Sequence, residues 1–367
     1  MPWIGMTPPQ DDEVEISVFG PGYGESILIH AGSGRWIVID SCLADDRRTP
    51  APLKYMSDIG LDASTDVCAV VATHWHDDHI KGLSAILRAC VKADYWYSAA
   101  LTKGEFLAFL AVHDNQPTTL DRGGTEMLKC LELMEEPGRK IKRLLEDTLV
   151  ADWPASRLAH GHATRLLALS PSSKQFDQFL RMIGAELYEL PLKAKTRLTA
   201  GRNDLSIASV LEVGALSVLL GADLEHCQDP DLGWAAVIHN RSGKGPKSAA
   251  IKVPHHGSAG AHHDQVWSEL LAEDVVSVVT PWSLAGKKLP TETDKVRISS
   301  LSKAAYITAE KPQTLKKRYP RAVTKHIRRS RVEITSSVYR CGHVRIRFPE
   351  ADLGKQVIEL FNGAAQY

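Results

Sequence analysis

The sequence predicts an α/β fold in which two β-sheets are sandwiched between helices. Short β-like runs dominate the first quarter of the chain, and a second series of such runs begins near residue 165. Helical patterns accompany both series, and strands followed by helices, repeated twice, are typical of a layered α/β fold. The 367 residues exceed the ~250–300 at which a single core stops growing, so we expect one large domain with an appendage, or two domains.

The first series of strands follows from alternation and from one buried run. The expected strands cover residues 14–18, 26–30, 35–40, 66–73 and 93–98. Residues 66–73 (DVCAVVAT) are almost continuously apolar, which is typical of a strand buried on both faces, and helical spacing predicts a helix over 82–91. Between the first two strands lies a glycine-punctuated loop, Phe19–Glu25. Its spacing does not fit a phosphate-binding loop that opens a helix.

The middle of the chain predicts helices, and strands resume after it. An insertion at about 101–158 is expected to contain three helices, because apolar residues recur at helical spacing there. Breaks between the helices are expected at Pro117, Gly123-Gly124 and Pro137-Gly138. Further strands are expected at residues 165–169, 206–213, 216–220, 249–253 and 275–280, with a helix at 265–272.

Charge is balanced over the chain but uneven along it. Lys plus Arg (44) equals Asp plus Glu (44), yet residues 311–347, the basic segment, carry twelve basic side chains and one acidic one. The segment therefore has a formal charge of +11 and the remainder −11. A solvated face and a contact with a polyanion are both compatible with its densest part. This part, the basic cluster, comprises Lys316, Lys317, Arg318, Arg328, Arg329 and Arg331.

The composition argues against the membrane, secreted and disordered classes. The longest apolar stretch, residues 206–222, is interrupted by Glu212, and the N-terminus has neither a basic start nor an apolar signal core. The six cysteines are scattered without a C-x-x-C pair, which suits a reducing compartment. We therefore expect a soluble, cytoplasmic protein.

The strongest chemical signal directly follows the buried strand. Three imidazoles and two carboxylates fall within six residues, at His74, His76, Asp77, Asp78 and His79. This ligand set suits zinc or manganese, and such density is costly to fold unless something neutralises it. The alternative is a polar surface loop. A metal site at the carboxyl end of a strand fits better, with His74 and His76 on one ion and Asp78 and His79 turned toward a second.

The pattern H-x-H-x-D-H after a buried strand resembles the signature of the metallo-β-lactamase-fold hydrolases. Three further segments add to the resemblance: Asp40 at a strand end, Asn203-Asp204-Leu205-Ser206 leading to Leu219-Leu220-Gly221-Ala222-Asp223, and Lys252-Val253-Pro254-His255-His256-Gly257-Ser258. The last resembles the K-V-x-H-H-G-S signature of the ComEC-like branch, which includes relatives resembling phosphorylcholine esterase. These segments span about residues 12–310.

The resemblance implies a four-layer αββα sandwich with a helical insertion and a basic C-terminal segment. Residues 1–310 would form the catalytic domain, with the insertion at about 101–158. Residues 311–367 would add the basic segment and closing strands, packed on the same domain. Residues 304–308 and 342–348 resemble the final strand pair of the ComEC-like branch.

The resemblance also implies a ligand set for two ions. His74 and His76 would hold one metal, and Asp78, His79 and one histidine of the His255-His256 pair the other. Asp223 would bridge both ions, with a turn or helix cap as the alternative for this residue. We favour His256 as the ligand, which leaves His255 to face the substrate.

Three more residues are expected to support the site. Asp40 would orient a ligating histidine, and the alternative for this residue is a turn at the end of the strand. Asn203 and Ser258 would contact substrate, and the alternatives for these two residues are turn and cap roles. The chain also departs from the wider superfamily, because the stretch Leu169–Ser173 lacks the histidine that many members carry after a middle strand. His160 or His162 can substitute for it, although a loop position explains both equally simply.

The function implied is that of a metal-dependent hydrolase with two divalent cations, Zn or Mn, in which Asp78, Asp223 and His255 act in catalysis. We expect a phosphodiesterase or nuclease, and nucleic acid is the preferred substrate because of the basic cluster. One alternative is a small phosphodiester, such as a nucleotide signal or a phosphocholine-type ester. Another is a non-catalytic, metal-stapled scaffold that binds a partner.

Overall fold

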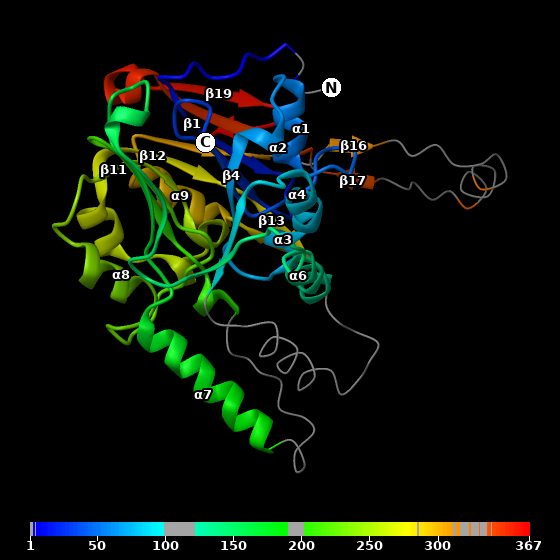
Figure 1. Cartoon of the computed structure of the whole chain (residues 1–367), viewed down its shortest axis with the longest axis vertical. Coiled ribbons are helices and arrows are strands. Elements are labelled where there is room, and N and C mark those ends of the chain that lie inside the picture. The colour runs from blue at the N-terminus through cyan, green and yellow to red at the C-terminus, as the bar shows by residue number, and fades with distance from the viewer. Residues whose placement is uncertain are drawn as a thin grey trace.

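The computed structural model describes residues 3, 5–98, 122–189, 202–284, 286–310, 313–315, 323, 330, 336–338 and 340–367 (Figure 1). Their strands form two eight-stranded sheets and two short hairpins. Helices flank the sheets, so the predicted two-sheet α/β architecture is confirmed.

The first sheet has the strand order β19-β18-β1-β2-β3-β4-β5-β6. In chain order its strands are β1 (Val14–Gly20), β2 (Ser26–His30), β3 (Trp36–Ile39), β4 (Val67–Ala72), β5 (Asp94–Ser98), β6 (Ile141–Leu144), β18 (Gly342–Phe348) and β19 (Val357–Phe361). The pairs from β3 to β6 are parallel and the others antiparallel. The expected apolar strand is β4, and all but one of its residues are buried.

The second sheet has the order β20-β15-β12-β11-β10-β9-β8-β7. Its strands are β7 (Leu149–Trp153), β8 (Thr164–Ala168), β9 (Ser209–Val213), β10 (Leu216–Leu220), β11 (Ser248–Lys252), β12 (Leu271–Val279), β15 (Ala304–Ile307) and β20 (Ala365–Gln366). The hairpins are β13 (Trp282–Leu284) with β14 (Lys287–Leu289), and β16 (Gln313–Leu315) with β17 (Ser336–Val338).

Three apolar clusters define four layers. The central cluster lies between the two sheets and contains Ile16 and Val71 from the first sheet and Leu211 and Val278 from the second. One outer cluster packs the first sheet against α1 (Ala51–Asp58), α4 (Leu83–Ala89) and α6 (Arg122–Leu133). The other packs the second sheet against α8 (Gly233–Arg241) and α9 (Glu292–Ser300). The remaining α-helices of the described chain are α2 (Ala63–Asp66), α3 (Asp77–Ile80) and α7 (Ser173–Glu189), and α7 extends away from the sheets (Figure 1).

The predicted helical insertion is only partly helical. Residues 99–121, which include the first expected helix, lie outside the described part, and α6 agrees with the second. The third is wrong, because β6 and β7 occupy this stretch as edge strands of the two sheets. Ile141 is exposed and Leu144 buried, so apolar spacing that fits a helix also fits an edge strand whose backbone pairs with β5.

Two smaller expectations are also corrected. Residues 304–308 and 342–348 do not pair with each other, because β15 lies between β12 and β20 while β18 lies between β1 and β19. The helix expected at 265–272 shortens to one π-helical turn, Val266–Leu270, because Leu271 already pairs with Ser248 of β11.

The C-terminal part of the chain contributes to both sheets. β18 pairs with β1 along seven residues, and β20 pairs with β15. All six residues of the basic cluster lie outside the described residues. Within the described part, none of the helices combines the length and apolar character needed to cross a bilayer.

Candidate metal centre

Three loops at one edge of the two sheets bring the predicted ligands together. They follow β4, β10 and β11 and carry His74 to His79, Asp223, and His255 with His256. The carboxyl ends of β10 and β11 lie side by side because the two strands are parallel. The loop after β4 reaches them from the other sheet, where Ile207 N donates to Thr73 O (3.2 Å).

The first group of donor atoms comes from His74, His76 and Asp223, whose donor atoms all lie within 4.8 Å of one another. His74 Nε2 is 3.0 Å from His76 Nδ1 and 3.9 Å from Asp223 Oδ2. Burial, and then the charges of His79 and His76, hold the pKa of His74 well below its usual value. A neutral imidazole with a free nitrogen is the form that binds a cation.

The second group, as we define it, contains Asp78, His79, His256 and again Asp223, and donor atoms of the last three lie together with one of Glu25 within 4.8 Å of one another. His256 Nε2 lies 3.2 Å from Asp78 Oδ2 and 3.6 Å from Asp223 Oδ2, and His79 Nε2 lies 3.3 Å from Asp223 Oδ1. Burial would raise the pKa of Asp78, but the close contact with His256 and the charge of His79 lower it to about 2. Asp223 therefore faces both groups.

Buried atoms without hydrogen bonds mark the centre of this arrangement. His79 Nε2, Asp223 Oδ1 and His256 Nε2 are buried and make no hydrogen bond within the described part of the chain. Each such atom costs roughly 1–3 kcal/mol when left unsatisfied. Imidazole nitrogens and carboxylate oxygens converging on one point are the donors that zinc and manganese accept, so the residues present fit a divalent cation.

Asp40 fixes the orientation of two of the histidines. Its Oδ2 accepts hydrogen bonds from His79 Nδ1 (2.7 Å) and Thr73 Oγ1 (2.6 Å), and Thr73 Oγ1 lies 3.0 Å from His74 Nδ1. Because the threonine proton is directed at Asp40, the threonine oxygen accepts from His74. Both imidazoles are thereby held with Nε2 turned toward the centre. Burial raises the pKa of Asp40 despite the hydrogen bonds from His79 and Thr73.

The two adjacent histidines point to different partners. His256 is buried, and its Nδ1 donates to Thr280 O (3.0 Å), which leaves Nε2 for the second group. The His255 side chain is 23% exposed and forms an ion pair with Glu225 (Nδ1 to Oε1, 3.0 Å). Burial lowers the pKa of His255, but the Glu225 hydrogen bond and the charge of Asp223 raise it above its usual value. His256 therefore lies with the second donor group, whereas His255 lies beside Glu225 at a partly exposed position.

The remaining predicted residues lie at the margin of the site. Asn203 Nδ2 donates to Glu225 Oε1 (2.8 Å) and lies 3.4 Å from His255 Nε2. Ser258 Oγ accepts from Gly260 N (3.3 Å), which is the cap role left open for it. His160 belongs to neither donor group, because its Nε2 donates to Ala31 O (3.1 Å).

Residues 19–165 match the family model of the metallo-β-lactamase superfamily. The chain has the metallo-β-lactamase fold. Most members of this superfamily are metal-dependent hydrolases, and they bind divalent cations, usually zinc. No curated protein matches the sequence.

Solved structures of this fold resemble the chain at low identity. YhfI from Bacillus subtilis, a metallo-β-lactamase fold protein, is 11% identical with a TM-score of 0.39, over 81% of this chain and 95% of that one. MEM-A1, a subclass B3 metallo-β-lactamase from a soil metagenome library, is 14% identical with a TM-score of 0.33, and the match covers 69% of this chain and 82% of that chain. Zn²⁺-bound PqqB from Methylobacterium extorquens is 12% identical with a TM-score of 0.31, and the match covers 62% of this chain and 55% of that chain.

Two residues of this metallo-β-lactamase fold were missed by sequence reasoning. Glu25 and Lys252 form a buried ion pair behind the second donor group, and Thr280 Oγ1 donates to Glu25 Oε2 (2.6 Å). Glu25 Oε1 lies 3.7 Å from His79 Nδ1, and its Oε2 lies 3.6 Å from His256 Nδ1. A lysine at the end of an apolar strand was the signal for the pair, but its partner lies 227 residues away in the glycine-punctuated loop.

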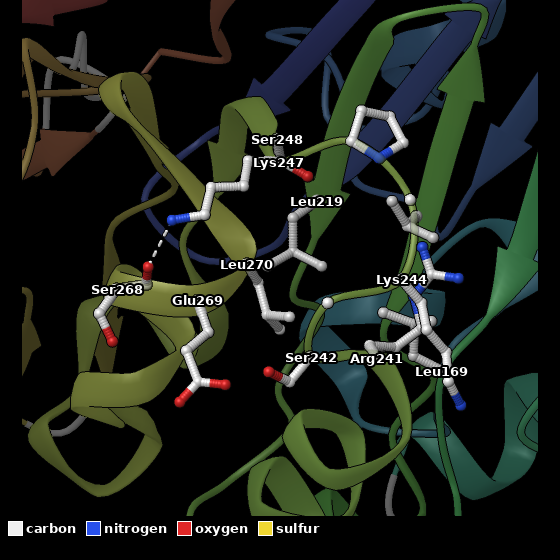
Figure 2. A pocket seen from close by; sticks show the side chains of 14 residues that line it. Leu169, Leu219, Arg241, Ser242, Lys244, Lys247, Ser248, Ser268, Glu269 and Leu270 are labelled. Atoms are coloured by element: carbon white, nitrogen blue, oxygen red, sulfur yellow. Dashed lines mark hydrogen bonds between the residues drawn. The ribbon is translucent and has the colours of Figure 1, made fainter.

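A cavity of about 350 Å³ lies elsewhere in the fold, on the face of the second sheet that carries α8 (Figure 2). Leu169, Leu219 and Leu270 form its apolar part, and Lys244 and Glu269 lie at its edge. None of its lining residues belongs to either donor group, so the chemistry is not expected in this cavity.

Proposed function

We propose that this protein is a cytoplasmic, metal-dependent phosphodiesterase that cleaves nucleic acid and uses two divalent cations, zinc or manganese. The observation that supports the proposal is the convergence of two donor groups on Asp223, with orphaned buried nitrogens aimed between them. The ligands would be His74, His76 and Asp223 for one ion, and Asp78, His79, His256 and Asp223 for the other.

When bound, two divalent cations supply a hydroxide at neutral pH and neutralise charge on a phosphoryl oxygen. The side chains of this chain would do the rest. Asp223 would hold both ions at a fixed separation, and Asp40 would keep His74 and His79 in the tautomer that binds them. The first site has three protein donors and so leaves positions for water and substrate.

His255 is the acid that this arrangement provides. The Glu225 hydrogen bond and the charge of Asp223 raise its pKa above the usual value, which favours the protonated imidazole, and its Nε2 lies 3.9 Å from Asp223 Oδ2. Glu225 orients the ring through Nδ1 and leaves Nε2 to face the substrate. We infer that His255 stabilises the developing negative charge or donates its proton to the leaving oxygen. A cation at this position suits a phosphodiester, whose charge is negative before and during the reaction.

Nucleic acid is proposed as the substrate because of the +11 charge of the basic segment. The Lys and Arg side chains of its basic cluster would neutralise phosphates on either side of the scissile bond, whereas Arg345 and Arg347 of the segment pair with Glu359 and Glu15 inside the fold. The segment connects β15 to β18, and these strands belong to the two sheets whose edges form the site.

The test is cleavage of labelled single- and double-stranded DNA and RNA with added manganese or zinc. We expect polymer cleavage that Asp78→Ala abolishes and that the matched variant Asp152→Ala retains, because Asp152 is an exposed residue of β7 outside both donor groups. Turnover of bis(p-nitrophenyl) phosphate without polymer cleavage would instead indicate a small phosphodiester. Polymer binding that chelators do not change, with no turnover of either substrate, would indicate a scaffold.

A further inference from the structure

Two aromatic side chains from different sheets meet beside the second donor group. Tyr23 lies in the glycine-punctuated loop between β1 and β2, and Trp282 begins β13. Their ring centroids are 6.3 Å apart with a 40° angle between the ring planes, and both side chains are half-buried. We call these two residues and the β13–β14 hairpin the aromatic lip.

The backbone fixes the aromatic lip close to the candidate metal ligands. Two residues after Tyr23, Glu25 N donates to Asp78 O (2.8 Å). Two residues before Trp282, Thr280 O accepts from His256 Nδ1 (3.0 Å). Each ring therefore lies two residues along the chain from a hydrogen bond to a member of the second donor group. The loop that carries Tyr23 and the strand end before Trp282 are also joined directly, because the hydroxyl of Thr280 donates to Glu25.

The hairpin adds apolar surface and positive charge to the lip. Trp282 is paired with Leu289, and Leu284 with Lys287, so these four side chains share one face of the hairpin. Leu284 is 50% exposed. Lys287 is exposed and forms no ion pair within the described residues, whereas Lys288 stands opposite Ser283 and so lies on the other face of the hairpin. An aromatic surface with an adjacent unpaired cation is the combination that binds a nucleobase together with its phosphate.

We propose that the aromatic lip is a stacking subsite for the base next to the scissile phosphate. The inference deepens the proposed function, because it identifies a nucleotide as the group on the Asp78 and His256 side of the site. A choline head group would also favour aromatic rings, but the positive charge of Lys287 on the same face repels a cation. The charge of the lip thus selects a nucleotide over a phosphocholine ester.

Three substrates with one leaving group test this subsite: the p-nitrophenyl esters of thymidine 5′-phosphate, of methyl phosphate and of phosphocholine. We expect the thymidine ester to have the highest kcat/KM. Trp282→Ala should lower that value about 5- to 150-fold, which corresponds to about 1–3 kcal/mol at 1.4 kcal/mol per tenfold, and should leave methyl ester turnover within about twofold. Trp282→Phe should retain most of the preference, because it keeps a ring. Trp153→Ala, which removes a half-buried tryptophan of β7, should change nothing.

A binding measurement separates this inference from the proposed function. The full chain is titrated with hydrolysis-resistant phosphorothioate decamers, one of thymidine and one abasic, which carry the same backbone charge. We expect tighter binding of the thymidine decamer, and Trp282→Ala should remove the difference. If neither the esters nor the labelled polymers are cleaved, the proposed function is wrong, but this difference still supports the subsite. The subsite is refuted by any of three results: equal affinity for both decamers, an unchanged preference in Trp282→Ala, or a preference for the phosphocholine ester.

Discussion

The buried ion pair between Glu25 and Lys252 allows a sharp test of how the candidate metal centre is held together. Both side chains are 2% exposed or less. Replacing Lys252 with Met keeps much of the side-chain volume but leaves the Glu25 carboxylate buried without its cation. We expect Lys252→Met to lower the free energy of unfolding by about 3–5 kcal/mol, the usual cost of removing one partner of a buried pair.

The structure provides a matched control and a rescue. Lys303 pairs with Asp274 on the surface, where the two side chains are 66% and 73% exposed. Lys303→Met should therefore cost no more than about 1 kcal/mol. Adding Glu25→Gln to Lys252→Met removes the uncompensated charge and keeps an acceptor for Thr280 Oγ1. The double variant should recover about 1–3 kcal/mol relative to Lys252→Met alone.

Urea unfolding followed by tryptophan fluorescence measures these differences. The experiment is run with a chelator and again with zinc, so that loss of fold stability is separated from loss of metal. Equal stabilities of Lys252→Met and Lys303→Met, or additive effects in the double variant, would show that the pair does not support the fold in the way we argue.

Three further outcomes follow from the proposed centre. Elemental analysis should find two transition-metal ions per chain and one in Asp78→Ala; protein that takes up no metal would end the hydrolytic assignment. Burial would lower the pKa of His79, but the charges of Asp223 and Glu25 outweigh it and hold that pKa well above 6.5. The protonated imidazole therefore stabilises the metal-free fold below pH 6.5, and this stabilisation is lost as pH rises through the folded pKa. A cation must displace this proton, so calorimetry at pH 7 in buffers of different ionisation enthalpy should detect proton release when the metal binds, and no release would contradict the assignment. Neutralising Arg328, Arg329 and Arg331 of the basic cluster should reduce the salt slope of nucleic-acid binding by about 2–3 units, whereas an unchanged slope would remove the reason for choosing a polymer.

The elements predicted well from sequence are those whose residue pattern is compatible with one type of secondary structure. Residues 66–73 are apolar on both faces, and a run of that length between polar loops can only be a strand covered by two layers. Residues 141–149 failed because their apolar spacing fits either a helix or an edge strand. The choice depends on whether β5 offers a free edge, and that is a property of the assembled sheet.

The same division applies to the candidate site. His74, His76, Asp78 and His79 lie on one short loop, so their meeting is a local consequence of the chain. Glu25 could not be found in this way. Its carboxylate becomes part of the centre only because Thr280 and Lys252 reach it from the other sheet. An acidic residue in a glycine-punctuated loop carries no sign of that contact.

The roles of His255 and His256 show most clearly what the assembled fold adds. Both residues have left-handed backbone conformations (φ 44° and 53°), which cost about 1–3 kcal/mol each and which only distant contacts can maintain. His255 N donates to Ala222 O (2.9 Å) after β10, and Arg297 of α9 donates to Gly257 O (2.7 Å). These contacts hold the turn in the form that sends one imidazole inward to Asp78 and the other outward to Glu225. The different surroundings of these two identical neighbours are therefore set by β10, β12 and α9, which is why the sequence of the turn alone could state a preference between them but not a reason.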